Sequence, residues 1–223
     1  MDSRSRRTLR ALAAGAAALL LVAGCGSDGS SADGASATTA TTTPSSLAGY
    51  VREPSLQVGD VALPDVSAGG APMAMRPPEG ELLLVYFGYT SCPDICPTTM
   101  SDIRVALESL PPELAERVSV AMVTVDPERD TDEVLSGYLE HFFDRAHPLR
   151  TDDPAELAAA AQAFTVQWEI EEHEPGEAYA VGHTSVTFVV DETGTVVVEW
   201  PFGVRSKDMA SDLTLLLSER ERS

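Results

Sequence analysis

A continuous apolar segment, residues 82–87, is the feature that most constrains how this chain of 223 residues can fold. Gly80 and Gly88 bound the segment. Six apolar residues in a row are typical of a β-strand that is covered on both faces. Residues 118–125, which are mainly apolar, predict a second strand of this kind. The two segments therefore indicate the central sheet of an α/β domain.

Four further segments of the predicted domain have the periodicity of helices. Apolar residues recur three or four positions apart over residues 103–114, 134–142, 157–164 and 209–217. Asp130, with Glu133 three residues later, is a start signal for the second of these helices. Residues 186–191 and 195–200 predict a hairpin around Gly194. This order predicts an α/β sheet flanked by helices, with its site at the carboxyl ends of the central strands.

Acidic residues outnumber basic ones by 35 to 15. Four arginines and one aspartate fall within the first 24 residues, so the remainder carries 11 basic and 34 acidic residues, a net charge of −23. Such a surface repels phosphate backbones and anionic lipids, which disfavours nucleic-acid binding and favours a basic or cationic partner. The hydrophobic content of 43% and charged content of 22% exclude a collagenous or multi-span membrane protein.

Residues 1–24 have the pattern of a signal peptide. Arginines precede an apolar run, residues 11–23, that is shorter than the roughly 20 residues of a membrane-spanning helix. The sequence Val22-Ala23-Gly24-Cys25 resembles a bacterial lipobox, which would make Cys25 the lipidated first residue of the mature protein. An ordinary signal peptide and an uncleaved anchor are the alternatives, and both the general and the twin-arginine export routes stay open.

Residues 25–48 are predicted to be a lipidated cysteine and a flexible tether. Residues 26–46 are almost entirely Ser, Thr, Ala, Gly and Asp, which cannot bury enough apolar surface to become ordered. The lipid on Cys25 would hold the remaining domain, residues 49–223, at the outer face of the bacterial cytoplasmic membrane. That domain is long enough for one core, and its single site and short tether favour a monomer.

Two cysteines, Cys92 and Cys96, lie between the first predicted strand and a helix that begins near Pro97. Sulfurs four residues apart at a helix start can face one side, close enough for a disulfide or a shared metal ion. The partial charge of the helix N-terminus stabilises thiolates, so we expect both cysteines to be more acidic than a free cysteine. Thiolates favour soft metals such as Cu(I). A purely structural disulfide would close a very short loop and stabilise little.

The chain has four histidines that could complete a metal site. His183 leads directly into the strand predicted over residues 186–191, at the same end of the sheet as the cysteines. We expect His141 at a helix end, His147 at the start of an edge strand and His173 in a solvated acidic loop. Zinc competes with copper, although a structural zinc site takes four ligands.

Met73 and Met75 offer thioether groups, but they lie in a segment rich in Gly and Pro. This composition fits a loop or hairpin better than a metal site.

The same residues resemble the SCO/SenC family of copper-binding proteins. The resemblance is carried by residues 87–100, which contain Cys92-Pro93-Asp94-Ile95-Cys96-Pro97, by residues 125–131, and by residues 181–184 together with 188–194. It implies a thioredoxin-like fold with a central mixed β-sheet flanked by helices and an N-terminal hairpin extension. It also implies that Cys92, Cys96 and His183 bind copper and that the protein helps to mature the dinuclear copper centre of cytochrome c oxidase subunit II. An acidic residue commonly precedes the family histidine, whereas this chain has Gly182 there.

Two functions remain open. In a metallochaperone, the Cys92, Cys96 and His183 side chains hold Cu(I) or Cu(II) and pass it to cytochrome c oxidase subunit II or another exported copper protein. In a thiol-disulfide oxidoreductase, Cys92 attacks a disulfide of such a partner and Cys96 resolves the mixed disulfide. Copper binding is favoured by the three-residue spacer between Cys92 and Cys96 and by the presence of His183. It is also favoured by Ser185, which stands where reductases carry a proline. A thiol peroxidase and a blue-copper protein are weaker alternatives.

Overall fold

The computed structural model describes residues 46–174 and 177–220. The expected signal peptide of residues 1–24, the lipidation site Cys25 and the tether up to residue 45 lie outside the described residues. Among the described residues, no helix is both long and apolar enough to cross a membrane.

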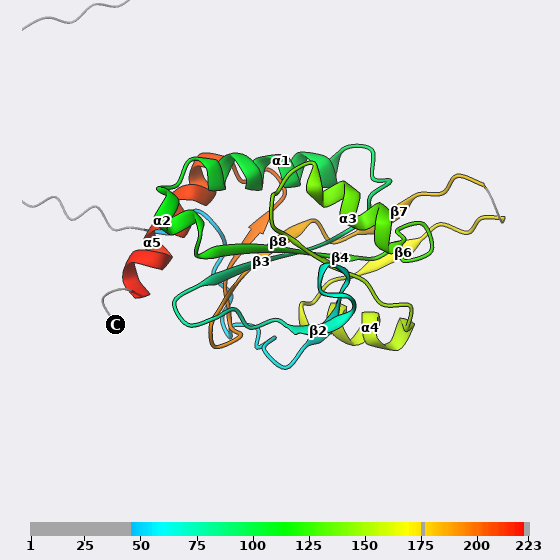
Figure 1. Cartoon of the computed structure of the whole chain (residues 1–223), viewed down its shortest axis with the longest axis horizontal. Helices are drawn as coiled ribbons and strands as arrows, with labels where there is room; N and C mark the ends of the chain where they lie inside the picture. Colours follow the sequence, from blue (N-terminus) through cyan, green and yellow to red (C-terminus); the bar gives the residue numbers. More distant parts are fainter. Residues whose placement is uncertain (1–45, 175–176, 221–223) are drawn as a thin grey trace, which may run out of the picture. The chain divides into compact units, whose positions relative to one another are not determined.

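One mixed sheet of seven strands, in the order β2-β1-β5-β4-β3-β8-β9, forms the centre of the described part of the chain (Figure 1). Strands β3, β4 and β5 are parallel, and every other pairing is antiparallel. The strands are β1 Ala62–Asp65, β2 Ala71–Ala74, β3 Leu82–Gly88, β4 Val118–Thr124, β5 His147–Leu149, β8 Val186–Asp191 and β9 Val196–Pro201. The predicted mixed sheet and the N-terminal hairpin, β1 with β2, are confirmed.

Helices cover both faces of this sheet. They are α1 Ile95–Glu108, α2 Pro112–Ala115, α3 Asp132–Glu140, α4 Pro154–Ala163 and α5 Ser206–Arg220, with a short 3-10 helix η1 Val66–Ala68. Helices α1, α3 and α5 lie over one face, and α4 lies over the other (Figure 1). Both α1 and α3 join parallel strands that advance in the same direction across the sheet, so the preferred right-handed crossover places them on one face. The crossover through α4 returns across the sheet and covers the opposite face.

Strand β3 is the buried centre of the domain. All seven of its residues are buried, as the apolar sequence predicts for a strand covered on both faces. Its parallel partner β4 runs in register with it, from Leu82 opposite Val118 to Gly88 opposite Thr124. The Phe164 ring, at the end of α4, packs between Phe87 of β3 and Phe188 of β8 with centroid distances of 5.3 and 5.1 Å. The carboxyl end of β3 is therefore held by a tightly packed core.

The helix predicted over residues 103–114 is in fact two helices. Helix α1 ends at Glu108, and the short helix α2 begins at Pro112. Pro111 and Pro112 have no backbone N–H to donate, so the first helix cannot continue through them. Leu110 is nevertheless buried and Leu114 packs against the core.

The start signal placed at Asp130 was wrong by one residue. Helix α3 is capped by Thr131, whose side chain accepts a hydrogen bond from the backbone N–H of Val134. Asp130 is instead fully buried. Strand β5, predicted to be an edge strand at His147, lies between β1 and β4 because the N-terminal hairpin covers it. None of these differences moves a predicted site residue away from the carboxyl end of β3.

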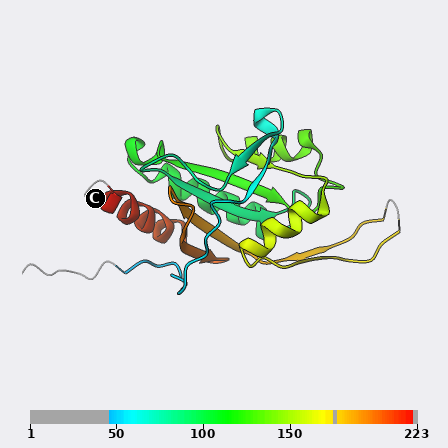
Figure 2. The same ribbon diagram turned by 90° about the horizontal axis from the view of Figure 1, so that it is seen from below.

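A separate two-stranded ribbon, which the sequence did not predict, lies outside the main sheet. It consists of β6 Trp168–Ile170 and β7 Val181–His183, paired antiparallel with Trp168 opposite His183. Figures 1 and 2 show this ribbon extending from the side of the domain at which β3 and β4 end.

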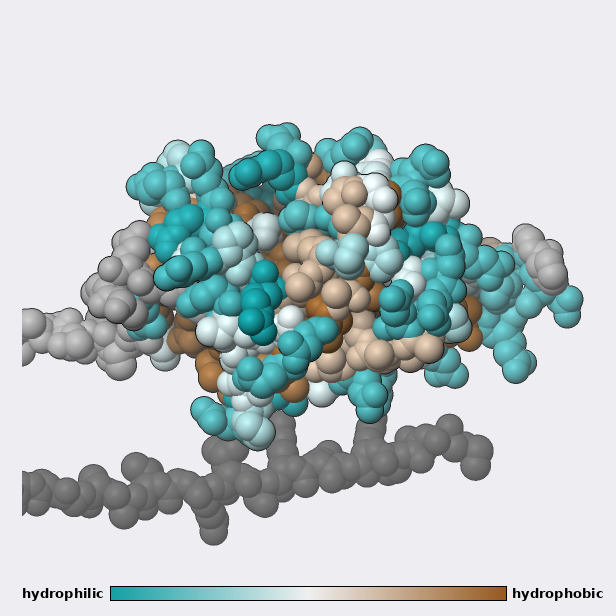
Figure 3. All heavy atoms as spheres, turned by 60° about the horizontal axis from the view of Figure 1, so that its bottom comes forward, coloured by the Kyte–Doolittle hydropathy of each residue, from teal (hydrophilic) through white to brown (hydrophobic). Residues whose placement is uncertain are grey.

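On the face seen in Figure 3, hydrophilic side chains surround a central area of more apolar ones.

Candidate metal centre

The two cysteines occupy different environments at the carboxyl end of β3. Cys92 lies in the loop after the strand and is partly exposed, whereas Cys96 is the second residue of α1 and is buried. The backbone N–H of Cys96 donates to the Cys92 sulfur over 3.4 Å. Asp94, at the N-cap position of α1, makes no side-chain cap hydrogen bond. The Cys92 sulfur therefore takes a place that a capping oxygen usually fills.

These environments separate the acidities of the two thiols. Partial burial acts to raise the pKa of Cys92, but hydrogen bonds from the backbone N–H groups of Cys96 and Asp94, and from side chains, outweigh it and leave the pKa lowered. Burial raises the pKa of Cys96 to about 12. The expectation that both cysteines are more acidic than a free cysteine is therefore correct for Cys92 and wrong for Cys96. The helix N-terminus stabilises a thiolate only where that thiolate is not cut off from solvent.

Close packing brings Cys96 to the end of β3. A Cβ atom at Gly88 would lie 3.0 Å from the Cys96 sulfur and 2.6 Å from Cε1 of Tyr86. Glycine at this position thus lets the helix and the Tyr86 ring approach the strand. The Tyr86 hydroxyl donates a hydrogen bond to the Cys96 sulfur over 3.6 Å.

His183 reaches the cysteines from the ribbon. Its Nε2 atom lies 3.4 Å from the Cys96 sulfur, and its Nδ1 atom lies 3.1 Å from the backbone carbonyl oxygen of Thr184. Because a carbonyl oxygen only accepts, Nδ1 carries the proton and the Nε2 lone pair faces the sulfur. Burial lowers the pKa of His183, which keeps the imidazole neutral. A neutral imidazole with a free Nε2 is ready to bind a metal.

Cys92, Cys96 and His183 form the one group of three or more metal-binding side chains among the described residues. One ligand atom from each lies within 4.8 Å of the others. The structure thus brings together all three residues that the sequence singled out. Two sulfurs and one imidazole nitrogen suit a soft metal ion such as Cu(I).

The remaining histidines are placed elsewhere. His141 ends α3, as expected, and His147 bonds through Nδ1 to the buried Asp65 over 2.7 Å. His173 is only partly exposed, because its ring stacks on Tyr179 at a centroid distance of 3.7 Å. Met73 lies in strand β2 of the hairpin, and Met75 is fully buried in the core.

Aromatic residues around the site were missed by the sequence interpretation. Tyr86 and Tyr89 both meet the His183 ring edge-on, at centroid distances of 5.9 and 5.8 Å. The two tyrosines stand three positions apart at the end of the buried strand, next to the cysteine motif, and this was the available signal. They form an apolar wall that shields the imidazole from water.

The loop after β4 also contributes, and its role was missed. Asp130 accepts hydrogen bonds from the backbone N–H of Thr90 over 3.0 Å and from the hydroxyls of Thr90 and Thr124, each over 2.6 Å. Burial raises the pKa of Asp130, an effect that these hydrogen bonds oppose. Thr90 stands two residues before Cys92, so Asp130 anchors the cysteine loop to β4.

The site is open on the ribbon side. A groove of about 700 Å³ runs along the ribbon and is lined by residues that include Trp168, Gly182 and His183. A larger groove, of about 1230 Å³, lies between α1, α3 and residues 142–148, and contains none of the three candidate ligands. The smaller groove is lined by His183 and by neither cysteine.

Comparison with known proteins agrees with this geometry. A sequence model of the family described as SCO1/SenC matches residues 65–218. The chain belongs to the SCO1/SenC family. An SCO2-like protein of Rickettsia prowazekii is 32% identical over 131 residues, which cover 58% of this chain and 63% of that protein. The chain thus matches slightly less than two thirds of the length of that relative.

Solved structures of the SCO1/SenC family share the fold. The apo Sco1 protein from Thermus thermophilus has a TM-score of 0.68 and 34% identity, and the alignment covers 77% of this chain and 97% of that one. ScoI of Bradyrhizobium japonicum, solved with copper bound, has a TM-score of 0.60 and 29% identity, with 70% and 96% of the two chains covered. The thioredoxin-like fold expected from the sequence is therefore confirmed.

Proposed function

We propose that the chain is a copper metallochaperone that holds one copper ion between the Cys92 and Cys96 sulfurs and Nε2 of His183. The observation that supports this most strongly is the convergence of these three atoms within 4.8 Å of one another. A relative of the same fold has been solved with copper bound. Three donors are too few for a structural zinc site, which takes four.

The different exposure of the ligands suits a site that loads and releases its cargo. Cys92 is partly exposed and His183 borders the open groove, while Cys96 is buried. A ligand of the partner protein would first replace Cys92 or His183, and Cys96 would be the last ligand to leave. Because the buried Cys96 thiol has its pKa raised to about 12, copper must displace its proton on binding.

We propose cytochrome c oxidase subunit II, or another exported copper protein, as the recipient. This follows from the likeness of the cysteine and histidine motifs to those of the SCO/SenC family. The net charge of −23 on residues 25–223 favours a recipient whose docking surface is basic. Docking that does not weaken with added salt would contradict the charge argument.

For location, we propose export through the signal peptide of residues 1–24 and anchoring by a lipid on Cys25. Residues 25–48 would then serve as a tether for the domain of residues 49–223 at the outer face of the cytoplasmic membrane. Replacing Cys25 with Ser should move the protein from the membrane fraction to the soluble fraction. Retention of the Cys25→Ser variant in membranes would contradict lipid anchoring.

The asymmetry of the two thiols supports a second function, thiol-disulfide exchange. The Cys92 thiolate would attack a partner disulfide, forming a mixed disulfide and releasing one partner thiolate. Cys96, after losing its proton, would attack the Cys92 sulfur and release the second partner thiolate. The partner gains two electrons, the chain ends with a Cys92–Cys96 disulfide, and an external dithiol reductant must restore it.

Copper titration distinguishes the two functions. The full chain carrying Cys25→Ser, reduced and kept anaerobic, would be titrated with Cu(I) against a competing chelator, beside further variants at Cys92, Cys96 and His183. We expect one ion per chain, lost in either cysteine variant and held more weakly in His183→Ala. A chain that retains no copper but rapidly reduces a partner disulfide would overturn the metallochaperone proposal in favour of the redox function.

A further inference from the structure

The ribbon that carries His183 lies outside the main sheet and contacts the core through Val181 and Trp168. It pairs with no strand of the main sheet, and many of its residues are exposed, among them Glu169, Ile170, Ala180 and Gly182. Two-stranded ribbons are marginally stable when isolated. The position of the histidine therefore depends on side-chain contacts that hold the ribbon in place.

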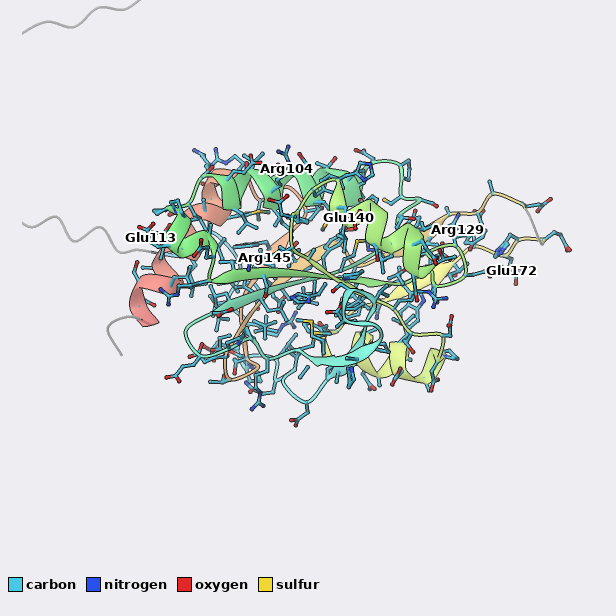
Figure 4. All side chains as sticks on the ribbon, viewed as in Figure 1. Arg104, Glu113, Arg129, Glu140, Arg145 and Glu172 are labelled. Atoms are coloured by element: carbon cyan, nitrogen blue, oxygen red, sulfur yellow. The ribbon has the colours of Figure 1, made fainter. Side chains whose placement is uncertain are left out.

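Arg129 supplies polar contacts of this kind. It lies in the loop between β4 and α3, at the base of the ribbon, while Glu172 lies farther along the ribbon (Figure 4). The guanidinium donates from Nη1 to the backbone carbonyl of Tyr179 over 2.9 Å. Its central carbon stands 3.6 Å from the centroid of the Tyr179 ring and 5.5 Å from that of Tyr89. One side chain thus links the ribbon to the aromatic wall of the site.

Asp126 completes a cluster with Arg129 and Tyr179. This fully buried carboxylate pairs with Nε of Arg129 and accepts a hydrogen bond from the Tyr179 hydroxyl over 2.8 Å. Tyr179 is therefore held at its backbone, at its ring and at its hydroxyl. Tyr179 stands two residues before the strand Val181–His183, so these contacts hold the chain close to the start of that strand.

The cluster is poorly arranged for stability alone. Nη2 of Arg129 is buried and has no hydrogen-bond partner among the described residues. Burying a charged pair costs desolvation energy, and an unpaired buried N–H adds to this cost. A buried ion pair is weak evidence for stability, and this one fixes the segment at Tyr179 against the loop after β4.

We propose that Asp126, Arg129 and Tyr179 form a latch that positions His183 against the two cysteines. This inference rests on the proposed copper site and concerns the residues that position its third ligand. The latch holds the histidine side through Arg129, while Asp130, the next residue of the same loop, holds the cysteine side through Thr90. Arg129 does not touch the metal; it acts through the ribbon.

Hydrogen exchange tests the latch without copper. In the reduced full chain, the backbone amides of Glu171 and Thr184, which bond to Ala180 and Gln167, report on ribbon opening. Arg129→Gln should speed their exchange by at least about tenfold, as expected on losing a hydrogen bond to a charged group. Tyr179→Phe, which removes only the bond to Asp126, should give a smaller change in the same direction. Arg104→Gln is the matched control, because Arg104 is paired only with Glu108 on α1. Unchanged exchange in Arg129→Gln would overturn the latch.

Copper affinity then tests the link to His183. Arg129→Gln should weaken copper binding by about tenfold, within the range found for residues that orient metal ligands. The same substitution added to His183→Ala should cause no further loss, since the ligand that it positions is gone. Equal losses in both backgrounds would indicate a merely structural role and overturn the latch. A wild-type chain that binds no copper would instead overturn the proposed function, and the exchange experiment would still decide whether the latch exists.

Discussion

The two sides of the candidate site are built in opposite ways. Cys92 and Cys96 sit between the buried strand β3 and the helix α1, where Cys96 belongs to the core and Cys92 is partly exposed. His183 sits on a short ribbon outside the main sheet, held by a cluster around Arg129. Cys96 is fixed by burial in the core, whereas the ribbon that carries His183 is held by the buried Val181, by Trp168 and by the polar contacts of Arg129.

This difference indicates which half of the site can change. Moving Cys96 would disturb the core packing at Gly88 and Tyr86, whereas moving His183 requires release of the ribbon and loss of its ring contacts with the tyrosines. A cargo site benefits from one firm side and one movable side, because the ion must be held and then given up. The following predictions test this contrast, beginning with the largest effect.

Removal of a sulfur from the firm side should have the largest effect. Cys96→Ser should weaken Cu(I) binding by at least about 100-fold, more than substitutions that only misorient a ligand. Serine nearly preserves the side-chain volume, so the core should remain intact. Competition with a Cu(I) chelator measures the affinity, and near-ultraviolet circular dichroism checks the packing. Wild-type affinity in this variant would remove Cys96 from the site.

The acidity of the two thiols should differ strongly. Because the pKa of Cys92 is lowered and burial raises that of Cys96 to about 12, Cys92 should lose its proton at a lower pH than Cys96. Iodoacetamide should therefore modify Cys92 at least about 100-fold faster than Cys96. The Cys92 rate should rise with pH through a midpoint below the usual thiol value of about 8.5. Peptide mass spectrometry after timed quenching measures the modification rate of each cysteine. Similar rates for Cys92 and Cys96 would contradict the predicted difference in acidity.

Removal of the ligand on the movable side should have an intermediate effect. His183→Ala should weaken copper binding by about 10–100-fold, because two thiolates remain and the third donor is lost. The Cys92–Cys96 disulfide should still form on oxidation, as the cysteine side does not depend on the ribbon. Thiol titration before and after oxidation measures this. A variant unable to form the disulfide would show that the two sides are not independent.

Glycine substitutions should give the smallest effects, with opposite signs. Gly88→Ala should destabilise the domain by about 1–3 kcal/mol, because the added Cβ overlaps Tyr86 and approaches the Cys96 sulfur. Gly137→Ala, in the middle of α3 with open space around its Cβ, should instead stabilise by about 0.5–1 kcal/mol. Urea unfolding of both variants measures the free energy of unfolding. Equal changes would contradict the close packing at β3.

Much of the firm side could be predicted from the sequence. The apolar residues 82–87 predict the buried strand, and the adjacent cysteine motif places Cys92 and Cys96 at its end. The movable side was harder to predict. The ribbon strands have only three residues each, and the positions of Arg129 and Tyr179, 50 residues apart, depend on tertiary contacts with no local signal. The raised pKa of Cys96 was missed because burial outweighs the favourable helix terminus.

X-ray absorption spectroscopy of the copper-loaded full chain tests the central claim most directly. With Cys25 replaced by Ser and one Cu(I) per chain, the copper should have two sulfur neighbours and one imidazole nitrogen. His183→Ala should abolish the imidazole scattering and keep both sulfurs. An imidazole signal that persists in His183→Ala, or a wild-type site with fewer than two sulfurs, would contradict the copper site formed by Cys92, Cys96 and His183.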